Sequence, residues 1–244
     1  MFHRPHHTLH LMNPSSKLTP LLGWLVTLLT PVVLALSVVR LLLFPAYLEV
    51  AYRLPGFPPD LYGFTFEERL HWARFGVEYL TNQADIEYLA DLRFPNGGQV
   101  PQFSCQYMDD CNKLYNVREL EHMVDVKNLV TLTLWVWRVA LIGLLALALW
   151  ARFGGWLPDF LRALARGGRL TTVLTGVIGL SAALAFGVIF VAFHQIFFRE
   201  GTWSFYWTDT LIRLYPERFW RDIFLIVALL PAALGALLGW GIKK

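Results

Sequence analysis

Four long, uninterrupted apolar stretches constrain this chain more than any other feature of its sequence. They cover residues 19–44, 128–151, 170–198 and 223–242. A transmembrane helix needs about 20 predominantly apolar residues to cross a hydrocarbon core about 30 Å thick. In lipid, the backbone of such a segment satisfies its own polar groups by forming a helix. The pattern therefore predicts an all-α, polytopic membrane protein with four transmembrane helices.

The composition excludes several other classes of protein. Hydrophobic residues make up 56% of the 244 residues and charged residues only 16%, whereas soluble domains contain about 25% charged residues. The net charge of +3 and the presence of only two cysteines argue against a strongly basic nucleic-acid-binding protein and a secreted disulfide scaffold. We expect the phospholipid bilayer as a partner and no nucleic acid. The first stretch is longer than a signal-peptide core and lacks a clear cleavage site, so we expect it to be retained.

The distribution of Lys and Arg predicts the orientation in the membrane. These residues are dense in the tail 1–18, in the basic connection 152–169 and at the last two positions, and they are sparser for their length in 45–127 and 199–222. Cytoplasmic segments of membrane proteins are enriched in Lys and Arg. We therefore expect a multi-pass protein of the cell membrane with both termini in the cytoplasm and with 45–127 and 199–222 outside it.

The long segment 45–127 is expected to form a small helical cap on the outer ends of the spans. Thr65 and Glu68 have the spacing of a capping box, which predicts the start of an amphipathic helix. Asn116 and Glu119 have the same spacing, which predicts a helix that continues into the second span. A further short helix is expected at residues 85–93.

Two cysteines and four amino-terminal histidines are candidates for a disulfide or for metal ligands. Cys105 and Cys111 are separated by five residues, and an oxidising exterior would permit a disulfide between them, although both could remain unpaired. No further ligands at zinc spacing lie nearby. The tail contains four histidines, which are more typical of a flexible cytoplasmic tail than of a metal site; they are His3, His6, His7 and His10. We expect no bound metal.

Two histidines from distant parts of the chain are the main candidates for chemistry. His122 precedes the second span, and His194 lies near the outer end of the third, so the predicted topology places both at about the same depth. Glu119 and Asp125 are each three residues from His122 and share its helix face, where they could orient the imidazole. The alternative is that both histidines are ordinary polar residues of the membrane interface.

Two arginines within the spans are further candidates. Arg138 lies deep in the second span, where a cation is costly unless it is paired or hydrated. It is therefore either functional or held by a structural partner such as Asp222. Arg40 lies near the end of the first span and can extend its side chain toward water. Either arginine could stabilise an oxyanion.

Several common catalytic motifs are missing from the sequence, which reduces the number of possible reaction mechanisms. There is no Gly-x-Ser-x-Gly elbow, no His-Glu-x-x-His zinc motif and no Walker loop. An enzyme with this sequence is expected to work by general acid–base catalysis, without a covalent enzyme intermediate and without a cofactor.

Three sequence blocks resemble those of a family of small bacterial membrane proteins with four spans. Residues 118–127 resemble the family segment R-E-L-x-H-M-x-D-V-K. Residues 190–205, with Phe-x-x-Phe-His-x-x-Phe-Phe followed by Gly-Thr-Trp-x-Phe, resemble a second block, and residues 214–222 resemble a third. Characterised members are lipoprotein intramolecular transacylases (Lit). The cysteines and the histidine tail are not features of that family.

The resemblance implies an activity and a site. Such enzymes move the sn-2 acyl chain of a diacylglyceryl lipoprotein to the α-amino group of the lipoprotein's own modified cysteine. The two family histidines regarded as the active site match His122 and His194. On this hypothesis His122, oriented by Asp125 or Glu119, deprotonates the amine and His194 protonates the departing oxygen, although the sequence leaves the two roles interchangeable. The alternatives are a non-catalytic scaffold or transporter subunit, or an acyltransferase with another acceptor.

Overall fold

The computed structural model describes residues 18–241, so the histidine tail with His3, His6, His7 and His10 lies outside the described residues. Ten helical elements follow one another along this part of the chain. They are α1 (Leu18–Leu42), α2 (Ala46–Tyr52), α3 (Phe66–Thr81), α4 (Glu87–Ala90), the 3-10 helix η1 (Pro95–Gly97), α5 (Gln102–Cys105), α6 (Val117–Phe153), α7 (Leu157–Phe197), α8 (Thr210–Leu214) and α9 (Glu217–Gly241).

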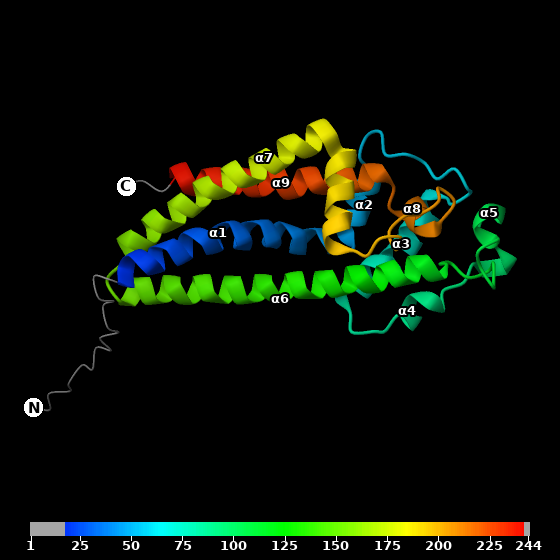
Figure 1. Cartoon of the computed structure of the whole chain (residues 1–244), viewed down its shortest axis with the longest axis horizontal. Coiled ribbons are helices and arrows are strands. Elements are labelled where there is room, and N and C mark those ends of the chain that lie inside the picture. The colour runs from blue at the N-terminus through cyan, green and yellow to red at the C-terminus, as the bar shows by residue number, and fades with distance from the viewer. Residues whose placement is uncertain (1–17, 242–244) are drawn as a thin grey trace, which may run out of the picture. The chain divides into compact units, whose positions relative to one another are not determined.

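Four of these helices, α1, α6, α7 and α9, are long and apolar enough to cross a membrane (Figure 1). Between residues 18 and 241 the only β-structure is an isolated antiparallel bridge between Arg93 and Lys113. The predicted all-α class with four candidate membrane spans is confirmed, and the protein is a multi-pass membrane protein.

The connection between the second and third spans differs from the expectation. Helix α6 ends at Phe153 and α7 begins at Leu157, so most of the expected basic loop 152–169 is helical. Gly155 has a φ of 77°, a left-handed conformation that glycine adopts at little cost, and it makes the tight turn. Arg152 therefore lies on the last turn of α6, and Arg162, Arg166 and Arg169 lie on the first turns of α7, not in a loop.

One compact unit contains the described parts of Met1–Ser37, Val136–Val177 and Leu229–Lys244. Its helices approach one another closely at glycines: a Cβ on Gly235 would lie 2.5 Å from the carbonyl oxygen of Gly168. Threonines tie neighbouring helices together in the same unit. The hydroxyl of Thr27 donates to the carbonyl of Ala163, and that of Thr172 donates to the carbonyl of Ala232. Small residues at helix contacts are typical of membrane bundles.

The second compact unit contains Val38–Trp135 and Ile178–Ala228. The short helices α2, α3, α4, α5 and α8 all belong to it (Figure 1). Its core is built from fully buried apolar side chains such as Leu48, Leu89 and Leu214. The predicted capping box at Thr65 and Glu68 is present and begins α3. Residues 85–93 form only the short helix α4.

A buried ion pair joins a loop of this unit to α8. Arg213 donates to both carboxylate oxygens of Asp60, at 3.0 and 2.9 Å, and both side chains are almost wholly buried. Burial alone would raise the pKa of Asp60. The hydrogen bonds from Arg213 and from the backbone N–H groups of Phe64 and Tyr62 outweigh this effect and hold the pKa below its usual value.

This lowered pKa predicts an acid-sensitive contribution to stability. The unfolded chain binds the Asp60 proton more readily, so the stabilisation is complete above about pH 4 and is lost as the pH falls through the folded-state pKa. We expect the unfolding temperature in detergent to drop on acidification below about pH 4, and the drop to be smaller in Asp60→Asn. An equal drop in both proteins would contradict the assignment to Asp60.

Cys105 and Cys111 form a disulfide. The bridge closes a small loop directly after Ser104, whose hydroxyl donates to Asp209 at 3.0 Å. By constraining the unfolded chain, a bridge over so short a loop stabilises by about 2 kcal/mol.

Replacing both cysteines with serine is expected to lower the free energy of unfolding by about 2 kcal/mol. Thermal unfolding of the variant and the parent in the same detergent measures the difference. Adding a reductant should lower the unfolding temperature of the parent toward that of the variant and leave the variant unchanged. A parent that is insensitive to reduction would argue against a stabilising bridge.

Candidate functional site

Helix α6 positions the first histidine. The helix begins with a reciprocal cap: the backbone N–H of Asn116 donates to the carboxylate of Glu119 at 2.8 Å, and the backbone N–H of Glu119 donates to the side-chain oxygen of Asn116 at 3.0 Å. The predicted capping box is therefore present. Because α6 has 37 residues and about 20 suffice to cross the bilayer, its first turns, with His122, extend beyond the length of a span.

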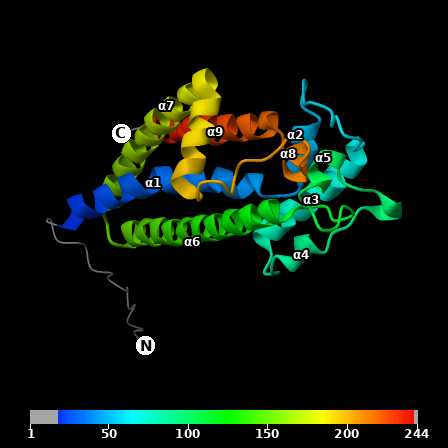
Figure 2. The same cartoon turned by 45° about the vertical axis from the view of Figure 1, so that its right-hand side comes forward.

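A sharp bend in α7 positions the second histidine. Ala185 has non-helical dihedral angles inside the helix, with φ −145° and ψ 51°, which mark a kink, and Figure 2 shows that α7 bends sharply along its length. His194 lies on the short segment after this bend. The depth expected for His194 from the sequence assumes a straight third span. The structure shows that His194 lies on a segment beyond a bend.

The structure brings the two histidines together. Their ring centroids are 6.0 Å apart and their planes differ by 20°. Only 6% of His122 and 9% of His194 is exposed. Two imidazoles at this separation can act on one reacting group, directly or through one water.

Aromatic side chains surround the pair. Phe198 contacts both rings, Phe205 contacts His122, and Trp203 and Phe190 contact His194, with centroid distances between 4.1 and 5.3 Å. Walls of this kind exclude water and suit an apolar substrate. Trp203 and Phe205 belong to the sequence block after His194 but were not predicted to line the site.

A hydrogen bond fixes the protonation pattern of His194. Its Nδ1 lies 2.7 Å from the carbonyl oxygen of Phe190. A carbonyl oxygen can only accept, so Nδ1 carries the proton and donates it. In the neutral ring this leaves the lone pair on Nε2, which is the atom able to take up a proton.

Four polar atoms around the pair are buried without a hydrogen-bond partner among the described residues. They are Nδ1 of His122, Oδ2 of Asp125, Nε of Arg118 and Nε1 of Trp203. Arg118, His122 and Asp125 follow one another at helical spacing on α6, and the Trp203 ring lies 5.0 Å from that of His194. Buried polar groups are normally paired, so this set is suited to a polar group of a bound substrate.

Glu119 does not have the role that was expected of it. Its carboxylate, 1% exposed, accepts the backbone N–H of Asn116 and, at 2.6 Å, that of Leu211 in α8. No hydrogen bond between described residues joins Glu119 or Asp125 to His122. Both Glu119 oxygens are occupied by backbone donors, so Glu119 fastens α8 to α6 and does not orient the imidazole.

Asp209 is a structural residue of the site that the sequence did not reveal. Its buried carboxylate accepts hydrogen bonds from Ser104, Asn116, Arg118 and the backbone N–H of Tyr206, at 2.8 to 3.2 Å. These donors come from three separate segments of the chain. Asp209 therefore fixes the loop with Trp203 and Phe205 to the start of α6. An aspartate in a loop carries no sequence pattern that would have singled it out.

The two arginines proposed for oxyanion stabilisation are not brought to the histidines. Arg40 packs its guanidinium on the ring of Phe44, 4.4 Å from the centroid. Arg138 is exposed, belongs to the other compact unit and lies more than four turns beyond His122 on α6. The arginine near His122 is Arg118, one turn earlier on α6; both residues contact the ring of Phe205. No group of three or more metal-ligating side chains occurs among the described residues.

Comparison with solved structures shows the same fold in a known membrane protein. The lipoprotein intramolecular transacylase Lit from Bacillus cereus superposes with a TM-score of 0.62 at 16% identity, covering 93% of this chain and 95% of that one. A structure of that protein with a histidine-to-arginine mutation gives a TM-score of 0.64 at 18% identity, covering 93% and 90%. At these identities the likeness concerns the fold.

Comparison with known sequences adds a relative and a family. A protein described only as uncharacterized, from Aquifex aeolicus (strain VF5), is 26% identical over 200 residues, which cover 78% of this chain and 79% of the relative. The family model of the lipoprotein intramolecular transacylase Lit matches residues 23–220. Because this match covers most of the chain and confirms the resemblance of its sequence blocks, the protein belongs to the Lit family of lipoprotein intramolecular transacylases.

Proposed function

We propose that this protein moves the sn-2 acyl chain of a diacylglyceryl lipoprotein onto the α-amino group of the lipoprotein's own terminal cysteine. The product is a lyso-form lipoprotein. The observation that carries the proposal is the buried pair of His122 and His194, 6.0 Å apart within an aromatic enclosure, in a chain of the Lit family. The substrate supplies both the nucleophile and the ester, so the enzyme needs neither a nucleophilic side chain nor a cofactor.

We assign both proton transfers to His194, because its hydrogen bond to Phe190 leaves Nε2 as the basic atom; the sequence had suggested His122 for the first transfer and His194 for the second. The neutral amine attacks the ester carbonyl carbon, and Nε2 of His194 takes the proton that the amine nitrogen loses. The bond from carbon to the glyceryl oxygen then breaks, and the imidazolium of His194 returns the proton to that oxygen. An α-amino group has a pKa of about 8, so a histidine is matched to this transfer at neutral pH.

The unpartnered donors around the pair are assigned to the developing oxyanion. Nδ1 of His122, when protonated, and Nε1 of Trp203 are buried N–H groups with no acceptor among the described residues. Donors that are already in place and shielded from water stabilise a tetrahedral intermediate strongly. Binding amine and ester on one molecule also gives a high effective concentration of the nucleophile.

The site is proposed to face the outer leaflet, with both termini in the cytoplasm. The Cys105–Cys111 disulfide supports this orientation, because disulfides persist outside the cytoplasm. The three arginines on the first turns of α7, Arg162, Arg166 and Arg169, support the opposite side as cytoplasmic. A lipoprotein anchored in the outer leaflet would present its ester and amine near the membrane surface.

Mass spectrometry of lipoprotein amino-terminal peptides tests the proposed activity. Cells that lack other N-acylating enzymes and express this protein should produce peptides with an N-acyl group and a monoacylglyceryl thioether. Cells with an empty vector should retain the diacylglyceryl form with a free amine. Intact diacylglyceryl peptides in the presence of well-expressed protein would refute the assignment, and acylation of another acceptor would identify a different acyltransferase.

Trp203→Phe isolates the proposed oxyanion donor. Phenylalanine keeps an aromatic ring beside His194 and removes only the N–H, so we expect kcat to fall by about 10²-fold while KM changes little. Trp207→Phe is the matched control, because Trp207 lies in the same loop and is 72% exposed. A loss confined to KM would indicate that Trp203 only binds substrate.

A further inference from the structure

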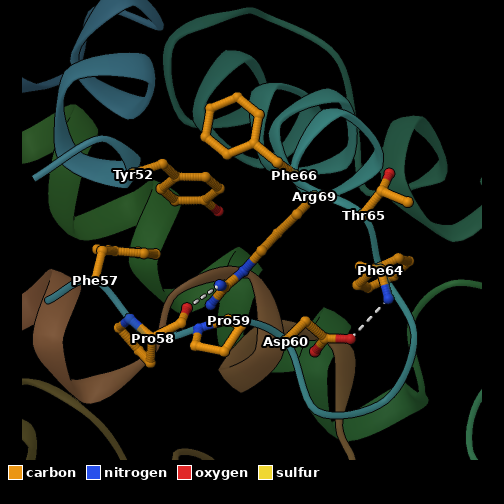
Figure 3. Close-up of a pocket in the computed structure, with 9 residues that line it drawn as sticks. All are labelled: Tyr52, Phe57, Pro58, Pro59, Asp60, Phe64, Thr65, Phe66 and Arg69. Atoms are coloured by element: carbon orange, nitrogen blue, oxygen red, sulfur yellow. Dashed lines mark hydrogen bonds between the residues drawn. The ribbon is translucent and has the colours of Figure 1, made fainter.

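A cavity lies in the second compact unit, among residues other than the histidine pair. It is a cavity of about 240 Å³ lined by nine residues of α2, α3 and the loop between them; they are Tyr52, Phe57, Pro58, Pro59, Asp60, Phe64, Thr65, Phe66 and Arg69 (Figure 3). By the same measure a single water needs only about 10–15 Å³. The cavity can therefore hold an organic group. Neither His122 nor His194 lines it.

Arg69 crosses this cavity. Figure 3 shows its side chain running toward the carbonyl of Pro58, with Tyr52 and Phe57 on one side and Asp60 and Phe64 on the other. Its Nη1 donates to Pro58 O at 2.7 Å and its Nε donates to Arg213 O at 2.6 Å. The guanidinium also lies 5.1 Å from the ring centroids of Tyr52 and Phe57. All of these partners are uncharged.

The charges at this site do not balance. Two guanidiniums, those of Arg69 and Arg213, lie beside one carboxylate, that of Asp60, and Arg213 engages both of its oxygens. Arg69 is 5% exposed and forms no salt bridge with any described residue. Burial lowers the pKa of Arg69 despite the nearby charge of Asp60, as expected for a cation that is incompletely compensated. A buried charge without a partner is costly.

Other charged groups near the rim do not neutralise Arg69. Arg53 lies 5.6 Å from the Phe66 ring and pairs with Glu49. Glu68 is exposed and is held by the backbone N–H and hydroxyl of Thr65. The hydroxyl of Tyr52 is a further, neutral hydrogen-bond partner of Arg69. Apart from Asp60, which Arg213 already engages, the Arg69 guanidinium therefore meets only neutral groups of the cavity lining.

We propose that this cavity binds a carboxylate carried on a small apolar body, with the carboxylate on Arg69 and the apolar part against the aromatic rings. Arginine forms strong charge-assisted hydrogen bonds with carboxylates, and aromatic walls supply the apolar contact. Two sources present this chemistry: a single-chain fatty acid, or an acidic residue beside an apolar one in a peptide. The proposal is independent of the transacylase activity.

Equilibrium dialysis of the full-length protein in detergent with radiolabelled phenylacetate tests the proposal. We expect saturable binding of one molecule per chain. Phenylethanol, which has the same ring without the charge, measures partition into micelles and should not saturate. Competition by hexanoate would identify a fatty-acid source, and competition by acetyl-Leu-Asp-amide a peptide source. Equal behaviour of phenylacetate and phenylethanol would overturn the proposal.

Variants locate the binding in this cavity. Arg69→Met should weaken phenylacetate binding at least about 10-fold, which corresponds to the loss of a hydrogen bond to a charged group. If Arg69→Met does not fold, Phe66→Trp tests the location of the binding site. Phe66 is 37% exposed and lines the cavity, so the larger ring should reduce phenylacetate binding without changing the unfolding temperature. Leu61→Trp, at an 83% exposed position, is the control. Unchanged binding in a folded Phe66→Trp protein would refute the site.

Discussion

Replacing His194 with glutamine is expected to lower the rate of acyl transfer by about 10²- to 10⁴-fold, the usual contribution of general acid–base catalysis. Glutamine can still donate a hydrogen bond to the carbonyl of Phe190, but it offers no nitrogen that takes up a proton near neutral pH. The loss should therefore appear in kcat, with the fold preserved. The measurement is the rate of conversion of a purified diacylglyceryl lipopeptide.

The matched control is His71→Gln. His71 is exposed on α3, and among the described aromatic rings it contacts only Trp72 and Phe75, so its replacement should leave the rate unchanged. Unfolding temperatures of both variants would show whether packing is preserved. A fully active, well-folded His194→Gln protein would eliminate His194 as the proton acceptor and with it the proposed mechanism.

Replacing Asp209 with alanine is expected to lower the free energy of unfolding by about 3 kcal/mol, because it leaves several donors without their shared acceptor and an unsatisfied buried polar group costs about 1–3 kcal/mol. The substitution leaves Arg118 without its carboxylate and deprives Ser104, Asn116 and Tyr206 of their shared acceptor. The loop with Trp203 and Phe205 should then lose its fixed position. The unfolding temperature in detergent and the rate of acyl transfer should therefore both decrease.

Asp209→Asn removes the negative charge and keeps nearly the same side-chain shape, so it measures the contribution of the charge alone. The amide keeps one oxygen as an acceptor and should therefore destabilise less than alanine. Glu78→Ala is a control for the loss of a carboxylate at another position, since Glu78 is half-buried on α3 and accepts a hydrogen bond from the hydroxyl of Tyr88 in α4. An Asp209→Ala protein as stable as Glu78→Ala would show that the Asp209 hydrogen bonds contribute little.

Features encoded by short-range spacing could be predicted from the sequence. The four apolar stretches gave the spans, and the positions of Thr65 with Glu68 and of Asn116 with Glu119 gave two helix starts, because a capping box involves only residues three apart. His122 and His194 were singled out by their depth and by the family resemblance. The structure adds that their rings are close to each other.

Features that depend on contacts between distant segments could not be predicted. Glu119 faces His122 on a helical projection, yet the backbone of Leu211, far along the chain, occupies its carboxylate. The bend at Ala185 contains no proline, and Gly187, two residues further on, does not by itself predict a bend inside an apolar span. Arg138 was selected because a charged side chain inside the bilayer is energetically costly. That argument does not predict which face of α6 the residue occupies or which residues it contacts.

The loop that closes over the histidines is not a module that could be transplanted by itself. The carboxylate of Asp209, at the end of this loop, accepts hydrogen bonds from side chains of α5 and of the residues that begin α6. A chimera that received this loop from a relative would therefore also need the recipient's Ser104, Asn116 and Arg118 to be retained or exchanged with it.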